Sequence, residues 1–192
     1  MEPARLEAFT DGVVAIIITI MVLEIHVPQG RDLAALRADV PVLLAYVLSY
    51  VNVGIFWNNH HHMLQVTERV DGKVLWANLA LLFWLSLVPF VIRWIDETGF
   101  TALPTAAYGV VLTCAAVCYT LLERQIIAAN GRDSRLAVAV GSDRKGQLSI
   151  VLYVSAIFLA FLRPWIAIAL YVAVAVIWLV PDTRIENLVK KT

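Results

Sequence analysis

Residues 5–23 of the chain read RLEAFTDGVVAIIITIMVL, a short polar head followed by a long apolar run. The apolar run extends from Phe9 to about Val27 and is closed by Pro28. A helix of about 20 apolar residues, rising about 1.5 Å per residue, crosses the roughly 30 Å hydrocarbon core of a bilayer. The segment has neither a basic leader nor a clear small-residue cleavage site. We therefore expect a retained membrane-spanning helix rather than a cleaved signal.

The composition of the whole chain agrees with a membrane location. Of its 192 residues, 60% are hydrophobic and only 16% are charged, and the mean hydropathy is +0.77. Soluble domains have about 45–50% apolar residues and about 25% charged ones. A water-soluble fold could not hide this much apolar surface, whereas lipid can serve as its solvent. Because there is no long basic stretch, we expect no binding to nucleic acid.

Five further apolar runs follow the first. A single straight helix over 148–180 would be about 50 Å long, which exceeds the hydrocarbon core. Pro164 disfavours helical backbone at Arg163, so this stretch is interpreted as a hairpin of two short helices. The predicted spans after the first are a run from Pro41 to about Val66, Val74–Ile95, Ala102–Ala129, Gln147–Leu162 and Trp165–Val180. The prediction is an all-α polytopic protein with six spans and one domain over residues 1–192.

The distribution of basic residues predicts the orientation of these spans, because cytoplasmic loops carry an excess of Lys and Arg. With six spans, the side that contains both ends of the chain carries most of them. These are Arg5, Arg69, Lys73, Arg124, Arg132, Arg135, Arg144, Lys145, Arg184, Lys190 and Lys191. The other side carries only Arg31, Arg37, Arg93 and Arg163. Both termini are therefore predicted to be cytoplasmic.

The first predicted helix has a distinct stripe. Ile16, Thr19, Ile20 and Leu23 follow helical spacing and lie within about 100° of one another. The stripe is consistent with an ordinary lipid-facing or packed surface, or with a functional one. Asp11 points about 140° away from Ile16 and lies near the membrane boundary, where a carboxylate marks either a functional site or a helix N-cap. The Thr19 hydroxyl has the simpler alternative of bonding back to a carbonyl one turn earlier, that of residue 15.

Polar residues also gather on the inner halves of the second and third predicted helices. The second carries FWNNHHH at residues 56–62, and the third carries Asn78. We expect these side chains to lie at the depth of Asp11 and to find partners on neighbouring helices. A metal site built on the three histidines is the alternative. It is disfavoured, because adjacent histidines on a helix point about 100° apart.

Two motifs resemble those of the transmembrane protein 175 family of potassium channels. Residues 5–11, RLEAFTD, resemble its Arg-x-x-x-Phe-Ser-Asp signature, with Thr10 in place of Ser. Residues 56–61, FWNNHH, resemble a second-helix motif of the family, with Leu64 where the family usually has Phe. The pairs Leu82-Phe83 and Pro89-Phe90 fit the family's third helix loosely, and the last three helices match the family in hydropathy alone.

The resemblance implies an assembly and a set of site residues. Members with one six-helix unit form tetramers in which the first helices line a central pore. The positions that match the family's pore constriction are Ile16, Ile20 and Leu23, and Thr19 matches the position that contributes to ion preference. Arg5, Phe9 and Asp11 match residues that hold helices and subunits together. We add to this anchoring group Thr10, Trp57, His60, His61 and Asn78.

These observations predict a potassium-preferring cation channel subunit in the plasma membrane, not an enzyme, with no cofactor and no metal. Its partners would be potassium, other monovalent cations, the lipid bilayer and further copies of the chain. Glu24 is either a cation-concentrating residue at the outer mouth or an exposed helix-end charge. Unperturbed histidine titrates near pH 6.5, so the histidines could make activity depend on pH. The alternatives are a small secondary transporter, a non-conducting structural membrane protein or a metal-dependent intramembrane enzyme.

Overall fold

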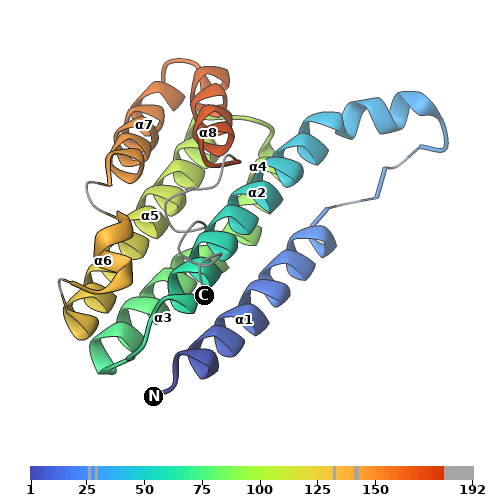
Figure 1. The fold of residues 1–192 in the computed structure, drawn as a ribbon. Helices are drawn as coiled ribbons and strands as arrows, with labels where there is room; N and C mark the ends of the chain where they lie inside the picture. The colour runs from blue at the N-terminus through green and yellow to red at the C-terminus, as the bar shows by residue number, and fades with distance from the viewer. Residues whose placement is uncertain (26, 29, 132, 141–142, 180–192) are drawn as a thin grey trace.

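The computed structural model describes residues 1–25, 27–28, 30–131, 133–140 and 143–179. Within these ranges every regular element is a helix, so the all-α prediction is confirmed. The helices lie side by side in one bundle, with α1 at its edge (Figure 1). In chain order they are α1 Pro3–Leu23, α2 Leu33–Gln65, α3 Gly72–Ser86, α4 Val88–Thr98, α5 Ala102–Asn130, α6 Arg135–Val140, α7 Arg144–Ala160 and α8 Pro164–Leu179.

The second helix begins earlier than the sequence suggested. It was expected to start after Pro41, but α2 starts at Leu33 and contains Pro41 in its interior. The Asp32 side chain caps this start, because its Oδ1 accepts a hydrogen bond of 3.0 Å from the backbone N–H of Ala35. A proline within a helix removes one backbone hydrogen bond. Here the cap and the long continuation of the helix outweigh that loss.

The third span is divided into two helices. α3 ends at Ser86 and α4 starts at Val88. Pro89 has no N–H and cannot donate to the carbonyl one turn earlier. The N–H of Leu87 instead bonds to the carbonyl of Trp84 at 3.2 Å, an i to i−3 contact that tightens the backbone. The two helices still continue one another, and together they are long and apolar enough to cross a membrane.

The chain between α5 and α8 follows the expected pattern, with one addition. The polar loop over 132–145 contains the short helix α6, and α7 and α8 form a hairpin that turns at residues 161–163. α7 and α8 have 17 and 16 residues, so each is about 25 Å long and shorter than the hydrocarbon core. Four longer candidate spans precede them in the described residues: α1, α2, α3 with α4, and α5. The total of six spans stays a prediction, and Val180 with the basic tail lies outside the described residues.

α5 is the helix on which the other elements are organised. α3, α4, α7 and α8 all pack on it, with α3 and α7 making the largest contacts. A close approach occurs at Gly109, where an added Cβ would meet the Tyr171 hydroxyl and the Ile157 side chain. The Tyr171 hydroxyl donates to the carbonyl of Thr105 at 3.0 Å and ties α8 to α5. α1 is attached differently, since it packs on α2, α3 and α4.

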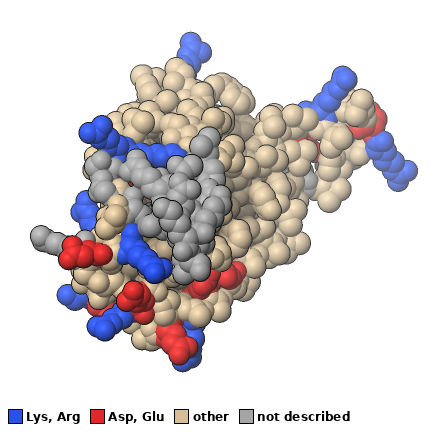
Figure 2. All heavy atoms as spheres, in the orientation of Figure 1, with Lys and Arg blue, Asp and Glu red and all other residues tan. Residues whose placement is uncertain are grey.

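The charged residues are separated from a broad apolar belt. On the face shown in Figure 2, blue and red atoms gather toward the ends of the molecule, and tan surface lies between them. Large hydrophobic side chains such as Phe158 (70%), Trp76 (75%) and Phe83 (57%) are exposed on the surface of the single chain. Apolar surface of this extent is stable when lipid or another copy of the chain covers it.

Candidate functional site: the first helix and the polar layer behind it

α1 has two unlike faces. One face is buried against the bundle through Leu6, Thr10, Val14, Ile17 and Met21. The opposite face is open and carries the stripe defined by the sequence: Ile16 is 58% exposed, Ile20 39% and Leu23 79%, and Thr19 is exposed beside them. The isoleucine and leucine side chains of this stripe therefore stay exposed in the single chain and are not part of its core.

The Thr19 hydroxyl donates its hydrogen bond within its own helix. Its hydroxyl donates to the carbonyl of Ile16 at 2.9 Å. The back-bond weighed from the sequence does form, but it is made to residue 16 and not to residue 15. A hydroxyl that donates its hydrogen to the backbone keeps its oxygen lone pairs as acceptors. On the open face of α1 these lone pairs are available to a cation or a water molecule.

Behind the stripe, three helices are joined by a chain of hydrogen bonds. Asn78 on α3 donates through Nδ2 to the Thr10 hydroxyl at 2.9 Å, and its Oδ1 lies 2.8 Å from Nε2 of His60 on α2. All three side chains are at most 1% exposed. Buried polar groups of this kind are stable only when they are bonded to one another. This chain of bonds therefore fixes how α1, α2 and α3 lie against each other.

Asp11 is bound from the second helix. Its Oδ1 accepts a hydrogen bond of 2.8 Å from the indole Nε1 of Trp57. Asp11 is the ninth residue of α1, so it does not cap the start of that helix. The N-cap position is Glu2, which makes no side-chain capping bond. The N-cap interpretation of Asp11 is therefore wrong, and its carboxylate has an interhelical partner instead.

A fourth contact in the same layer involves Glu7, which was not among the predicted site residues. Its Oε1 lies 2.5 Å from Nδ1 of His61, and Nε2 of His61 lies 2.8 Å from the side-chain nitrogen of Gln65. The rings of His61 and Trp57 stack with centroids 5.9 Å apart. Glu7 precedes Asp11 by four residues, so helical spacing places both on one face. That spacing is the signal that could have identified it.

The other two residues of the first-helix motif lie away from this layer. Arg5 and Phe9 are exposed in the single chain, and Phe9 has 51% of its surface open. Within one subunit the structure does not bring them together with the layer. Their anchoring role stays a prediction that concerns contacts between subunits.

The histidines diverge. His60 faces Asn78, and His61 faces Glu7 and Gln65. Among the described residues, no group of three or more His, Cys, Asp or Glu side chains is placed to hold a metal ion. His62 lies against the His61 ring, with ring centroids 5.7 Å apart, and His26 lies outside the described residues. The layer is thus a hydrogen-bonded joint between helices.

At the other end of α1, Glu24 is the C-cap residue and is paired. Its Oε2 lies 2.9 Å from Nη1 of Arg93 on α4. Nε of the same arginine lies 2.9 Å from Oε1 of Glu97, one turn further along α4. Glu24 therefore shares a guanidinium with a second carboxylate. No spacing pattern indicates this contact, because 69 residues separate the two partners.

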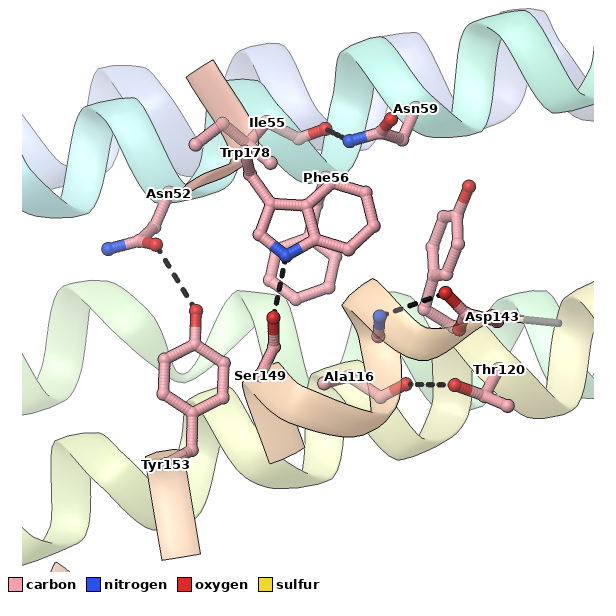
Figure 3. Close-up of a pocket in the computed structure, with 12 residues that line it drawn as sticks. Asn52, Ile55, Phe56, Asn59, Ala116, Thr120, Asp143, Ser149, Tyr153 and Trp178 are labelled. Atoms are coloured by element: carbon pink, nitrogen blue, oxygen red, sulfur yellow. Dashed lines mark hydrogen bonds between the residues drawn. The ribbon is translucent and has the colours of Figure 1, made fainter. Parts of the chain in front are cut away.

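A second group of polar side chains lies between α2, α5, α7 and α8 (Figure 3). The hydroxyl of Tyr153 points to Oδ1 of Asn52 at 3.4 Å, and the side chain of Asn52 donates to the hydroxyl of Tyr108 at 3.2 Å. Trp178 donates through its indole nitrogen to the Ser149 hydroxyl at 2.8 Å. These bonds connect the four helices around a narrow hollow. The residues are scattered singly along the chain, so no spacing in the sequence revealed them.

Comparisons with known proteins agree with this architecture. The family model for the endosomal/lysosomal potassium channel TMEM175 matches residues 5–89. A potassium channel of Chryseobacterium sp. (strain P1-3) is 51% identical over 191 residues, 100% of this chain and 100% of the relative. One of Streptomyces collinus is 32% identical over 160 residues, 73% of this chain and 78% of the relative.

A solved structure is similar over nearly the whole fold. It is the crystal structure of a lysosomal potassium-selective channel TMEM175 homolog from Chamaesiphon minutus. The TM-score is 0.83 and the sequence identity 26%, covering 94% of this chain and 98% of that chain. The likeness extends past the first three helices, to which the family motifs are confined.

The fold and the polar layer define the class, an all-α membrane protein whose first helix is pinned to the bundle on one face and open on the other. The chain belongs to the TMEM175 family. The resemblance drawn from residues 5–11 and 56–61 is thereby confirmed, and the family is one of ion channels rather than enzymes.

Proposed function

We propose that the chain is the subunit of a potassium-preferring cation channel in which four copies of α1 surround a central pore. The observation that supports this most directly is the open stripe of Ile16, Thr19, Ile20 and Leu23 on a helix whose other face is buried. Copies arranged around a rotation axis present the same surface to the centre. Such an arrangement would turn the stripe into rings of side chains.

The rings of Ile16, Ile20 and Leu23 form an apolar constriction in this proposal. A narrow apolar ring closes a pore by excluding water, so it acts as a gate as well as a filter. The chain has no Thr-Val-Gly-Tyr-Gly sequence, the source of the carbonyl filter of other potassium channels. Preference for potassium would come from its lower dehydration cost relative to sodium, with Thr19 oxygens replacing part of the lost water.

The polar layer keeps the gate in place. Asp11, Thr10 and Glu7 all extend from the face of α1 that turns toward α2 and α3, so they fix the rotation of α1. Arg5 and Phe9, which are exposed in the single chain, would complete this joint between subunits. Rotating α1 by one residue would move the isoleucines about 100° away from the axis.

The arrangement in the membrane follows from the same proposal. Six spans would place both termini in the cytoplasm, and the bacterial potassium channels to which the chain is similar favour the plasma membrane. The permeant ions would be potassium and, less readily, other monovalent cations.

Ion flux into liposomes tests the proposal. We expect purified wild-type protein to pass potassium faster than sodium. Ile16→Ala should raise the flux of both ions by about tenfold, since the Ile16 ring would have four small alanine side chains in place of four isoleucines. Val22→Ala is the matched control. It removes a side chain of similar size from the same helix at a position that is 49% exposed and lies about 120° around the helix from Ile16.

The other possible outcomes would each contradict a part of this proposal. Flux that saturates with one substrate would support the small secondary transporter, whose site lies at mid-membrane breaks. No flux from protein shown to be tetrameric would support a structural role. Equal flux in wild type and Ile16→Ala would remove Ile16 as the constriction.

A further inference from the structure

The outer end of α1 shares a groove with α4. Glu24 and Arg93 line this groove together with Ile16 and Ile20, and Phe90 lines its α4 side. The two charged residues therefore open onto the same hollow as Ile16 and Ile20, two of the three proposed constriction residues. Charges placed here act on ions that approach the apolar rings.

Arg93 is held between two carboxylates from different helices. It binds Glu24 through Nη1 and Glu97 through Nε, each at 2.9 Å. Glu24 stands at the C-terminus of α1, where the helix dipole is negative and a carboxylate is disfavoured. A cation at this point offsets both the carboxylate and the helix dipole.

The exposure of these side chains indicates which effect of Arg93 matters. The side chains of Arg93 and Glu97 are 58% and 60% exposed, and that of Glu24 is 27% exposed. Ion pairs this open to solvent add little to stability, so the pair is a poor tether for the helix. The potential that such charges create at a pore mouth is a separate quantity, and it changes the local concentration of cations.

We infer that Arg93 sets the electrostatic potential at the outer end of the ion pathway and limits the accumulation of cations there. Glu24, Arg93 and Glu97 together carry one net negative charge per subunit. Neutralising the arginine doubles that charge in every subunit. The inference rests on the proposed function, because it needs α1 to face the pore. It makes Arg93 a determinant of conduction that touches neither Thr19 nor the apolar rings.

Single-channel recording in planar bilayers tests this inference. Arg93→Gln is expected to raise the inward potassium conductance about threefold in 20 mM salt and to have almost no effect in 1 M salt, where the screening length falls to about 3 Å. The double variant Arg93→Gln/Glu24→Gln restores the net charge and should return to the wild-type conductance. Arg93→Lys keeps the charge without the two-sided geometry and should also behave as wild type.

Arg163→Gln is the matched control. It removes an exposed arginine from the turn between α7 and α8, which Figure 1 shows at the far side of the bundle from α1. An equal rise for Arg93→Gln at both salt concentrations would show that the residue acts on the gate geometry, and it would overturn the inference. An unchanged conductance in a channel that still responds to Ile16→Ala would overturn the inference alone. A wild-type protein without conductance would overturn the proposed function as well.

Discussion

At the scale of single residues, the layer behind α1 is built from side chains with specific partners on neighbouring helices. Trp57 meets Asp11, and Asn78 bridges Thr10 and His60. A hydrogen bond to a charged group contributes about 1.5–3 kcal/mol, and a buried partner left without its bond costs a similar amount. Single substitutions in the layer should therefore lower the stability of the protein measurably. The size of each loss should identify the hydrogen bond involved.

Asp11→Ala is expected to reduce the fraction of tetramer, because α1 would lose the bond that fixes its rotation. Native mass spectrometry or light scattering of the purified protein measures this fraction. Asp11→Asn keeps an acceptor for Trp57 and should assemble better than Asp11→Ala. Trp57→Phe keeps the ring and removes the donor, so it should resemble Asp11→Ala, and the double variant should be no worse than either single one. Normal tetramers from Asp11→Ala would remove the anchoring role.

Thr19 carries a prediction about selectivity. Thr19→Val keeps the shape of the side chain and removes the oxygen, so the ratio of potassium to sodium permeability should fall severalfold toward one. Thr19→Ser keeps the oxygen and should preserve the ratio. Reversal potentials in mixed potassium and sodium solutions measure it. A valine variant with the wild-type ratio would assign the preference to the apolar rings alone.

The pH dependence suggested by the histidines also belongs to this scale. His61 faces Glu7 and Gln65, and it lies against Trp57 and His62. If His61 is responsible, potassium flux should vary between pH 5 and 8 in the wild type and much less in His61→Gln. A flat wild-type profile would remove the histidines from the mechanism.

At the scale of helices, the close approach of α5, α7 and α8 depends on one small residue. Gly109 lies where a methyl group would meet the Tyr171 hydroxyl and the Ile157 side chain. The Tyr171 ring is fully buried and packs edge-on to Tyr108 with centroids 5.3 Å apart. A methyl group at position 109 would therefore press on a buried ring that is already packed against Tyr108.

Gly109→Ala is expected to destabilise the protein by about 1–3 kcal/mol, the usual cost of overpacking a filled core. Thermal unfolding in detergent, followed by circular dichroism, measures the loss as a lower midpoint temperature. Gly72→Ala is the control, because an added Cβ at this exposed helix start meets nothing within 4 Å. If both variants unfold at the wild-type temperature, the α5–α8 contact is looser than the structure indicates.

At the scale of the whole molecule, the arrangement in the membrane depends on whether the hairpin of α7 and α8 crosses the bilayer. The prediction of six spans requires α7 and α8 to cross the bilayer. Both helices are short for the hydrocarbon core. If this hairpin did not cross completely, the polar loop before it and the tail after it would be placed differently. The topology is therefore testable through the accessibility of these segments.

Cysteine labelling in whole cells gives that test. In a background with Cys114 and Cys118 replaced by serine, an impermeant maleimide should label Arg31→Cys from outside. Ser134→Cys and Thr192→Cys should react only after the membrane is permeabilised. Labelling of Thr192→Cys from outside would mean an odd number of spans and a C-terminus on the other face.

The sequence by itself determined the class of the fold. Hydropathy and helix length are local properties, so the all-α character and the positions of most spans followed from them. Helical periodicity also placed the isoleucine stripe opposite Asp11, since both belong to one helix and the angle between them depends only on spacing. The family followed from two short motifs, at residues 5–11 and 56–61.

The tertiary structure decided which residues of different helices meet. The spacing of residues along one helix holds no information about these contacts. The pairs Glu7–His61 and Glu24–Arg93 join positions far apart in the chain, and their contact depends on how each helix is rotated and how deep it lies. The start of α2 ahead of Pro41 has a local cause instead, the Asp32 cap, since no side chain of α2 before Ala45 is buried. Local chemistry fixed the elements, and only their mutual packing fixed the partners.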